Sequence, residues 1–505
     1  MTSQSIGYLV KKGSVITLIT LISRPLGYVR EAVQAYLFGA TLLVDAFVIA
    51  FNFPEMVQTL FFSGATSAFL IPVCSRYLAD REEFSRIYSL FINLSIMVTL
   101  IVSLLFLCGS GYIMNVIAPG FAPEQRRVAT YLFMIMIPII TLHAVLSVMK
   151  AFLNAKEHFA APEMSGIAWN LIFILAALAF YKKIGIYSLA LGVTVGSAAQ
   201  VFIQIPYMRR LDIRYYRRML PLDHPAVQEA KSLFLGALLA TSIVPINSFV
   251  GRIIASYLPA GEVASLSYAF RIFILPFSLF AVPTYTVLFS KMSKLYHEKD
   301  WKDMASHIDS SLVLVAITLI PSTVFLCLVG DSVVRILYER GAFTPRDTLI
   351  TYRALFGYGI GLIFYALSIS FVRIFNAMHD MKTPALIGLS SIVLNAVLAY
   401  VMMTPLKNLG ISLATSLVSF YNFLVLYLIF RRRTGYRPSR GTKRELVRSL
   451  VAGIILALVT FLLCRSLPIH PYGALLLSIL AALVIYGLFF KKYYLSFVLK
   501  KLKRG

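Results

Sequence analysis

The chain has 505 residues, of which 59% are hydrophobic, and its mean hydropathy is +0.80. Soluble domains are about 45–50% apolar, whereas apolar runs of about 20 residues recur here from end to end, so the composition excludes an ordinary soluble protein. The net charge of +25 comes from 47 Lys and Arg against 22 Asp and Glu, and most of the excess falls in loops and the C-terminal tail. This pattern indicates a topology signal and contact with anionic headgroups rather than nucleic-acid binding.

Hydropathy predicts an all-α polytopic membrane protein with fourteen spans. In chain order they cover 12–37, 42–73, 85–108, 128–151, 164–182, 186–207, 228–258, 263–290, 309–330, 348–375, 384–403, 409–431, 446–465 and 472–490. Loops after even-numbered spans and the tail hold about 29 Lys and Arg, against about 9 on the other side. Both termini are therefore expected in the cytoplasm. The longer loops near 109–127 and 331–347 are expected to form short helices.

An internal repeat divides the chain. Asn154-Ala155, followed by Pro162, matches Asn376-Ala377, followed by Pro384, at an offset of 222 residues. The repeat predicts an N-lobe of six helices (1–225), a C-lobe of six helices (226–433), and two further helices with a basic cytoplasmic tail (434–505). Because six is even, the lobes enter the membrane in the same orientation, which makes a parallel repeat. Transporters built in this way hold substrate between lobes and alternate by rocking.

The first two spans carry unexpected charges, at Arg24, Arg30, Glu31, Asp45 and Glu55. Each charge at the bilayer centre costs roughly 2.5–3.5 kcal/mol on insertion scales, so these groups are not expected to face lipid. On a helix Arg24 and Glu31 share a face and Arg30 lies about 120° away, an arrangement that suits a wide cavity.

Pro25 and Gly27 lie beside these charges in the first span. Pro25 removes a helical hydrogen bond and Gly27 adds a second weak point, so a bend is expected. Two explanations stay open: a helix that bends as a moving gate, and simple accommodation of close packing.

The second lobe supplies the counterparts Arg252, which is 222 residues after Arg30, and Arg271. Facing lipid, the four arginines would together cost on the order of 10 kcal/mol. Either they form buried ion pairs that fix helix register, or they line a cationic cavity for an anionic ligand. Arginine favours bidentate contact with phosphate, which supports the second reading.

Covalent chemistry has no support in the sequence. The four cysteines lack paired spacing, and no metal-ligand spacing, nucleophile–base pair or phosphate-binding glycine loop is present. A transporter without a cofactor is expected, rather than an enzyme. His143, His158 and His379 are expected at helix ends or in loops, in ordinary interfacial roles.

Around the charged residues of the spans, the sequence resembles the MurJ (MviN) family, the lipid II flippases of the multidrug/oligosaccharidyl-lipid/polysaccharide exporter superfamily. The matching text is SRPLGYVRE, FGATLLVDAFVIAF, GATSAFLIPV, YAFRIFILP, LFAVPTYTVLFSK, YERGAFTPRDT and RIFNAMHDMKTP, spread over essentially the whole chain. The resemblance implies fourteen helices, two lobes around a central cavity, and a groove from helices 13 and 14 for the lipid tail. By position, Arg24, Arg30 and Arg271 match the family's cavity arginines, Asp45 matches its span-2 aspartate, and Glu31 stands where Asp is common.

The chain also departs from the family pattern. Gln58 stands where a basic residue is usual, Ser63 where an acidic one is usual, and Ile274 replaces an acidic residue in span 8. Some members bind sodium between carboxylates of helices 7 and 11, but here Gly251 and Ala399 fall at those positions. Asn395 and Thr415 remain, so at most a degenerate sodium site is expected.

The function expected is export of the lipid-linked peptidoglycan precursor, lipid II, from the cytoplasmic to the outer leaflet of a bacterial cytoplasmic membrane. The alternatives are export of another isoprenoid-diphosphate-linked saccharide, a cation-coupled drug antiporter, and a scaffold for cell-wall synthesis enzymes. The antiporter predicts that carboxylates outnumber bases in the cavity, and the sequence shows the reverse. Coupling to sodium or to the membrane potential is a hypothesis.

Overall fold

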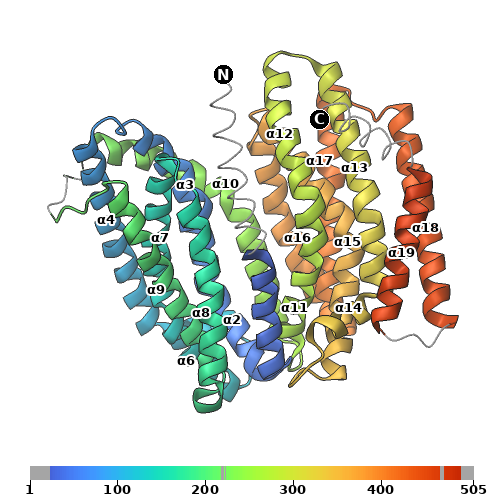
Figure 1. Cartoon of the computed structure of the whole chain (residues 1–505), viewed down its shortest axis with the longest axis horizontal. Coiled ribbons are helices and arrows are strands. Elements are labelled where there is room, and N and C mark those ends of the chain that lie inside the picture. Colours follow the sequence, from blue (N-terminus) through green and yellow to red (C-terminus); the bar gives the residue numbers. More distant parts are fainter. Residues whose placement is uncertain (1–22, 218–220, 222, 467–470, 491–505) are drawn as a thin grey trace. The chain divides into compact units, whose positions relative to one another are not determined.

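The computed structural model describes residues 23–217, 221, 223–466 and 471–490 (Figure 1). All regular elements in these residues are helices, which confirms the all-α fold class. The chain divides into two compact units, Met1–Val263 (unit 1) and Ala264–Gly505 (unit 2), and each is described by itself.

The described part of unit 1 begins with a helix over residues 23–38. It continues with α2 (Leu42–Gln58), the π-helical turn η1 (Thr59–Ser63), α3 (Gly64–Ser75), α4 (Arg81–Cys108), α5 (Ser110–Ile117), α6 (Pro123–Met136), α7 (Pro138–Ala155), α8 (Ala160–Ile184), α9 (Tyr187–Arg210) and α10 (Pro225–Ala255). Asp80 starts α4 by accepting the backbone amides of Glu82 and Glu83, at 3.0 Å each. Gly185 ends α8 with φ +57°, a conformation that favours glycine.

Unit 2 begins within the first turn of α11 (Glu262–Pro276). It continues with the π-helical turn η2 (Phe277–Ala281), α12 (Val282–His297), α13 (Trp301–Leu328), α14 (Gly330–Tyr338), α15 (Pro345–Ala377), α16 (Lys382–Leu406), α17 (Asn408–Thr434), α18 (Arg440–Ser466) and α19 (Pro471–Phe489). Thr344 and Asp347 form a reciprocal capping box that starts α15. In Figure 1, α18 and α19 run beside each other and α18 packs against α13.

The predicted repeat is visible in the helix ends. The first and last residues of α8 and α16 differ by 222 in both cases. Left-handed turns recur at the same offset: Glu157 (φ +55°) corresponds to His379 (φ +59°). The two π-helical turns also correspond, since each interrupts the helix that follows the opening helix of its repeat. The internal repeat is therefore visible in the structure, and α18 and α19 follow it. The parallel orientation of its two halves stays a prediction.

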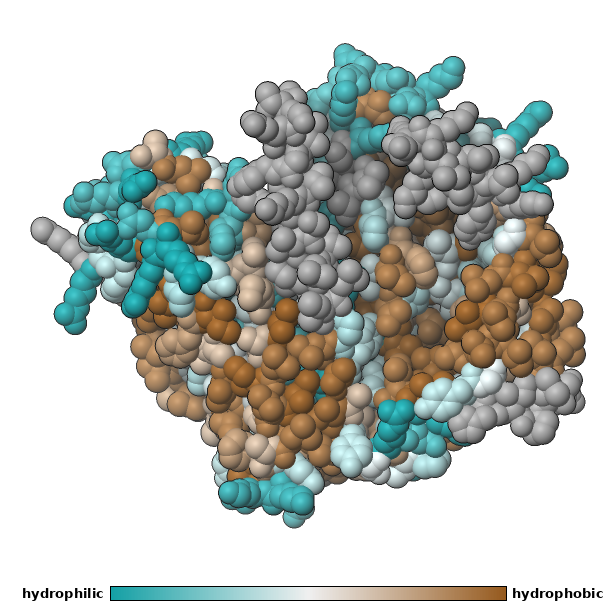
Figure 2. All heavy atoms as spheres, viewed as in Figure 1, coloured by the Kyte–Doolittle hydropathy of each residue, from teal (hydrophilic) through white to brown (hydrophobic). Residues whose placement is uncertain are grey.

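Twelve helices in the described residues are long and apolar enough to cross a membrane. The other two predicted spans fall on α10 and on the helix over residues 23–38, whose predicted beginning lies outside the described residues. The short helices expected in the two longer loops are confirmed as α5 and α14. Leu105, Val393 and Leu483, each within a spanning helix, are at least 65% exposed, and Figure 2 shows broad hydrophobic surface over the helices. Such surfaces mark contact with lipid.

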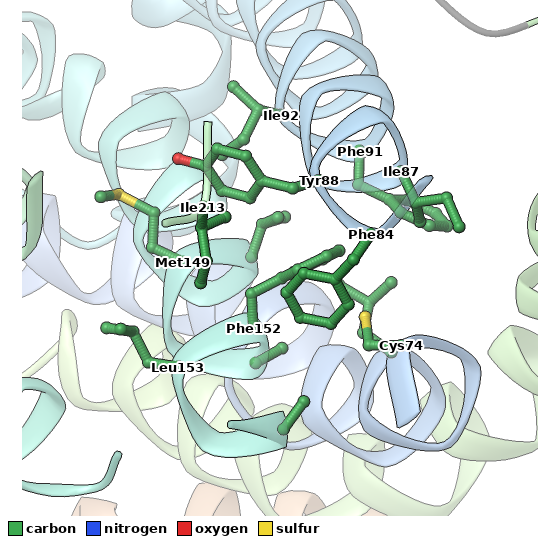
Figure 3. Packing of buried hydrophobic residues seen from close by; sticks show 14 of the residues in the cluster. Cys74, Phe84, Ile87, Tyr88, Phe91, Ile92, Met149, Phe152, Leu153 and Ile213 are labelled. Carbon is green, nitrogen blue, oxygen red and sulfur yellow. The ribbon is translucent and has the colours of Figure 1, made fainter. Parts of the chain in front are cut away.

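Aromatic side chains form the core at one end of unit 1 (Figure 3). The ring centroid of Phe152 in α7 lies 4.9 Å from that of Phe84 and 5.3 Å from that of Tyr88, both in α4. A corresponding cluster in unit 2 joins α15 to α17 through Phe371 and Phe430. These cores hold the spanning helices in fixed register within each unit.

The predicted lobe boundaries at residues 225 and 433 stay predictions. The repeat assigns α10 to the second set of six helices, whereas α10 packs against α2 and α3 and belongs to unit 1.

Candidate functional site

Arg30 and Glu31 form a buried ion pair on the helix over residues 23–38. Arg30 is 9% exposed and Glu31 is 7% exposed, and the Arg30 guanidinium donates to the Glu31 carboxylate. The guanidinium carbon also lies 4.7 Å from the ring centroid of Trp169 and 5.4 Å from that of Phe173, both in α8. A carboxylate partner and aromatic faces stabilise a guanidinium that has left water. Both charges are thus held inside unit 1.

The indole of Trp169 is itself positioned by α9. Its Nε1 donates to the Ser197 hydroxyl at 3.3 Å, and a Cβ added at Gly196 would lie 2.9 Å from the indole Cδ1. A larger residue at 196 would therefore displace the ring on which Arg30 rests. Sequence reasoning missed Trp169, although it is one of only two tryptophans in the chain.

Arg24, Pro25 and Gly27 lie at the start of the described part of this helix. Arg24 and Pro25 are exposed. A Cβ at Gly27 would meet no atom within 4 Å, so close packing does not explain this glycine. The carbonyl of Leu21, which Pro25 would leave without a helical donor, lies outside the described residues, and the predicted bend stays a prediction.

Asp45, in the first turn of α2, is 1% exposed. Its carboxylate accepts the backbone amide of Gly261 at 2.6 Å. Gly261 has φ +87°, a conformation that favours glycine. A hydrogen bond to an ionised acceptor is stronger than a neutral one, which compensates for burying the carboxylate.

Glu55 and Arg252 are brought together across α2 and α10. The Arg252 guanidinium lies 3.6 Å from the Glu55 carboxylate, with side chains 29% and 39% exposed. An ion pair this open to solvent contributes at most about 1 kcal/mol. The pair supplies an acidic partner for one of the predicted arginines.

Arg271 and Ile274 lie in α11. Arg271 is exposed and Ile274 is partly buried. The other face of α11 is fixed by Phe273, whose ring centroid lies 5.5 Å from that of Tyr358 and 5.4 Å from that of Tyr365, both in α15. Arg271 and Phe273 lie on different faces of α11, since residues two apart on a helix are about 200° apart.

Gln58 and Ser63 lie at the two ends of the π-helical turn η1. Gln58 ends α2 and is partly buried, and Ser63 is the last residue of η1. The side chain of Ser63 lies outside the part of the chain that the structure describes. π-Helical turns occur frequently at functional sites and weaken a helix locally. Sequence reasoning missed both π turns, because helical periodicity does not reveal one inserted residue.

The residues predicted to hold sodium offer two side-chain oxygens. Asn395 is 4% exposed and its Oδ1 has no hydrogen-bond partner. The Thr415 hydroxyl donates to the carbonyl of Ile411 at 3.2 Å, which leaves its oxygen lone pairs available. The described residues contain no group of three His, Cys, Asp or Glu that could hold a metal ion. The degenerate sodium site stays a prediction.

The prediction for His143 is wrong. His143 lies inside α7 and is 6% exposed, with Nδ1 unpartnered. Gln204, on the neighbouring helix α9, is fully buried and neither of its side-chain polar atoms has a partner. Buried polar groups inside a membrane bundle are rare and usually functional. His158 and His379 lie in turns, as predicted.

Twelve helices of membrane-spanning length in the described residues, together with the buried Arg30–Glu31 ion pair, define a multi-pass membrane protein. A family model described as "Lipid II flippase MurJ" matches residues 34–483. The chain belongs to this family.

Similar proteins agree with this assignment. The chain is 28% identical over 453 residues to a protein named probable lipid II flippase MurJ from Buchnera aphidicola subsp. Baizongia pistaciae, with 88% of each chain covered. It is 27% identical over 448 residues to the lipid II flippase MurJ of Burkholderia cenocepacia, with 87% of each covered. A solved lipid II flippase MurJ in an inward closed conformation matches with a TM-score of 0.83 and 25% identity, covering 96% of this chain and 99% of that one.

A multidrug resistance MATE family transporter of the MOP superfamily, in an inward-facing conformation, shares the fold. Its TM-score is 0.72 at 13% identity, covering 85% of this chain and 99% of that one. The predicted family is confirmed.

Proposed function

We propose that the protein is a flippase that moves lipid II from the cytoplasmic to the outer leaflet of a bacterial cytoplasmic membrane, for peptidoglycan synthesis. The observation that carries the proposal is family membership over residues 34–483. Transport makes and breaks no bond. The task is to carry a diphosphate-bearing headgroup across hydrocarbon while its long isoprenoid tail stays in lipid.

Arginines in the spanning helices suit this task. Arg24, Arg30, Arg252 and Arg271 would replace the water around the diphosphate with bidentate charge-assisted hydrogen bonds. When no substrate is bound, the ion pairs with Glu31 and Glu55 would hold Arg30 and Arg252 in position. Alternating access would then carry the headgroup outward.

Coupling to the membrane potential would supply the direction of transport. Moving one elementary charge through the membrane field yields about 2.3 kcal/mol per 100 mV. Sodium, held near Asn395 and Thr415, is the alternative source. Rates that do not change when the potential is collapsed in proteoliposomes would count against this coupling.

The distribution of basic residues supports an orientation with both termini in the cytoplasm. The basic segment over residues 431–444 would then face cytoplasmic partners, among them enzymes that make the precursor. Cysteine accessibility on either side of the membrane tests this orientation.

A second candidate is export of another isoprenoid-diphosphate-linked saccharide. Gln58, Ser63 and Ile274 favour it, because they replace charged residues common in the family. Both substrates carry diphosphate, so the arginines do not separate them. Complementation of cells depleted of their own lipid II flippase distinguishes the two candidate substrates. Restored growth supports lipid II as substrate, and failure of a well-expressed protein supports the second candidate.

A further inference from the structure

Unit 1 has a pocket of about 530 Å³ near the beginning of α4 and the ends of α7 and α9. The segment 212–216 borders it. Its floor is apolar: Met149, Met208 and Ile213 are at most 3% exposed. Figure 3 shows the Tyr88 hydroxyl directed toward Met149 and Ile213. Methionine side chains adapt to ligands of irregular shape, so this floor suits a flexible apolar group.

Hydrogen bonds to α4 hold the segment at the mouth of the pocket in place. The backbone amides of Arg214 and Tyr216 donate to the hydroxyls of Ser85 and Ser89, at 3.2 and 2.8 Å. The two serines are one helical turn apart on α4, so they anchor alternate residues of the segment. Tyr215 is fixed as well, because its hydroxyl donates to the side chain of Asn93 at 2.7 Å.

Positive charge exceeds negative charge around this mouth. Asp212 is contacted by Arg214 at 2.9 Å and by Arg81 at 3.6 Å. Lys156 lies beside them and donates to the carbonyl of Leu211 at 2.7 Å. Burial and the nearby Arg81 lower the pKa of Lys156, and the charge of Asp212 only partly opposes this shift. Arg209 also lines the pocket and has no ion pair among the described residues.

We propose that this pocket binds an anionic phospholipid of the bilayer, with its phosphate between Arg209 and Arg214 and its glycerol and upper acyl chain over the apolar floor. A free phosphate would leave that floor empty. The pocket wall includes Ile205, and Phe202, one turn earlier on α9, is 67% exposed. An acyl chain that leaves the pocket along α9 therefore continues over lipid-facing surface. Nothing in this site depends on the transported substrate.

Photo-crosslinking in the full-length protein tests the site. The probe is phosphatidylglycerol with a photoactivatable acyl chain, in nanodiscs otherwise made of phosphatidylcholine. Peptides covering residues 202–216 should carry the label. Arg209→Gln should reduce labelling about fivefold, since one basic residue near the membrane contributes about 1 kcal/mol. This variant leaves the Asp212 ion pairs and the serine anchors in place. Arg431→Gln, at the basic end of α17, should label like the wild type.

Three outcomes overturn the proposal. Equal labelling by a phosphatidylcholine probe would mean that charge does not select the lipid. Loss of labelling on addition of millimolar inorganic phosphate would mean a free-phosphate site. An equal loss of labelling in Arg209→Gln and Arg431→Gln would mean that the overall positive charge of the protein attracts the lipid. The readout is lipid labelling, so it stands apart from transport.

Discussion

The carboxylate of Asp45 accepts the backbone amide of Gly261 at 2.6 Å, although the two residues are 216 positions apart in the chain. Asp45 lies in the first turn of α2, and Gly261 directly precedes α11, which carries Arg271. The contact therefore fixes the turn between α10 and α11 onto the first turn of α2, within unit 1. A buried charge in this position makes the contact sensitive to substitution.

Asp45→Ala should destabilise the protein by about 1–3 kcal/mol, because the Gly261 amide loses this acceptor. Asp45→Asn keeps a neutral acceptor and should lose less. Thermal unfolding in detergent measures both. Glu124→Ala, at an exposed site in the first turn of α6, is the matched control. The assignment is wrong if Asp45→Ala unfolds at the same temperature as that control.

Arg30→Ala should destabilise the protein by about 3–5 kcal/mol, since it leaves the Glu31 carboxylate buried without its partner. The double variant Arg30→Ala/Glu31→Ala should recover part of that loss, because no uncompensated charge remains. Unfolding measurements on the single and double variants give the coupling.

Transport assays on the same variants separate a structural role of Arg30 from a role in substrate binding. If Arg30 contacts the diphosphate, the double variant regains stability but stays inactive. Recovery of transport together with stability would restrict Arg30 to a structural role.

Removal of a π-helical turn should slow transport without unfolding the protein. Deleting Ser278 converts η2 into regular α-helix and keeps the flanking helices in register, since a π turn amounts to one inserted residue. If the turns allow α11 and α12 to bend during alternating access, the deletion should reduce the transport rate about tenfold, equivalent to ~1.4 kcal/mol. Deletion of Lys299, in the turn before α13, is the control. Full activity after deletion of Ser278 would remove the π turn from the mechanism.

Asp380 should make stability depend on acid pH. Although burial opposes ionisation, hydrogen bonds from Thr383 and the charge of Arg433 lower the pKa of Asp380. Because the folded pKa lies below the unfolded one, the carboxylate stabilises the protein above the ordinary aspartate value of about 3.9. That contribution is lost as the pH falls through the folded pKa. Asp380→Asn should therefore be less stable than the wild type at neutral pH, and the difference should shrink as the pH falls below the ordinary aspartate pKa and through the folded one. A difference that persists in acid contradicts this assignment.

The repeat and the buried charges could be predicted because they leave marks in the sequence. The offset of 222 residues between Asn154 and Asn376 reappears in the ends of α8 and α16. Arginines inside apolar runs required partners, and Arg30 and Arg252 have them. Hydropathy located the spans because the bilayer sets their length.

Other features depend on tertiary contacts that a single sequence does not reveal. The support of Arg30 by Trp169 requires the packing of α8 on Gly196 of α9. The partner of Asp45 is a backbone amide, which every residue except proline carries. His143 lies inside the predicted span 128–151, but hydropathy does not show that its side chain faces the interior of the bundle.

Lipid II accessibility in proteoliposomes tests the central claim most directly. The assay measures how fast lipid II becomes exposed in the opposite leaflet with wild type, with Arg24→Ala and without protein. If cavity arginines carry the diphosphate, wild type exposes lipid II well above the protein-free rate. Arg24→Ala should then be roughly tenfold to a hundredfold slower, as loss of a charge-assisted hydrogen bond of about 1.5–3 kcal/mol requires. A wild-type rate equal to that of protein-free vesicles, or an Arg24→Ala rate equal to wild type, would contradict it.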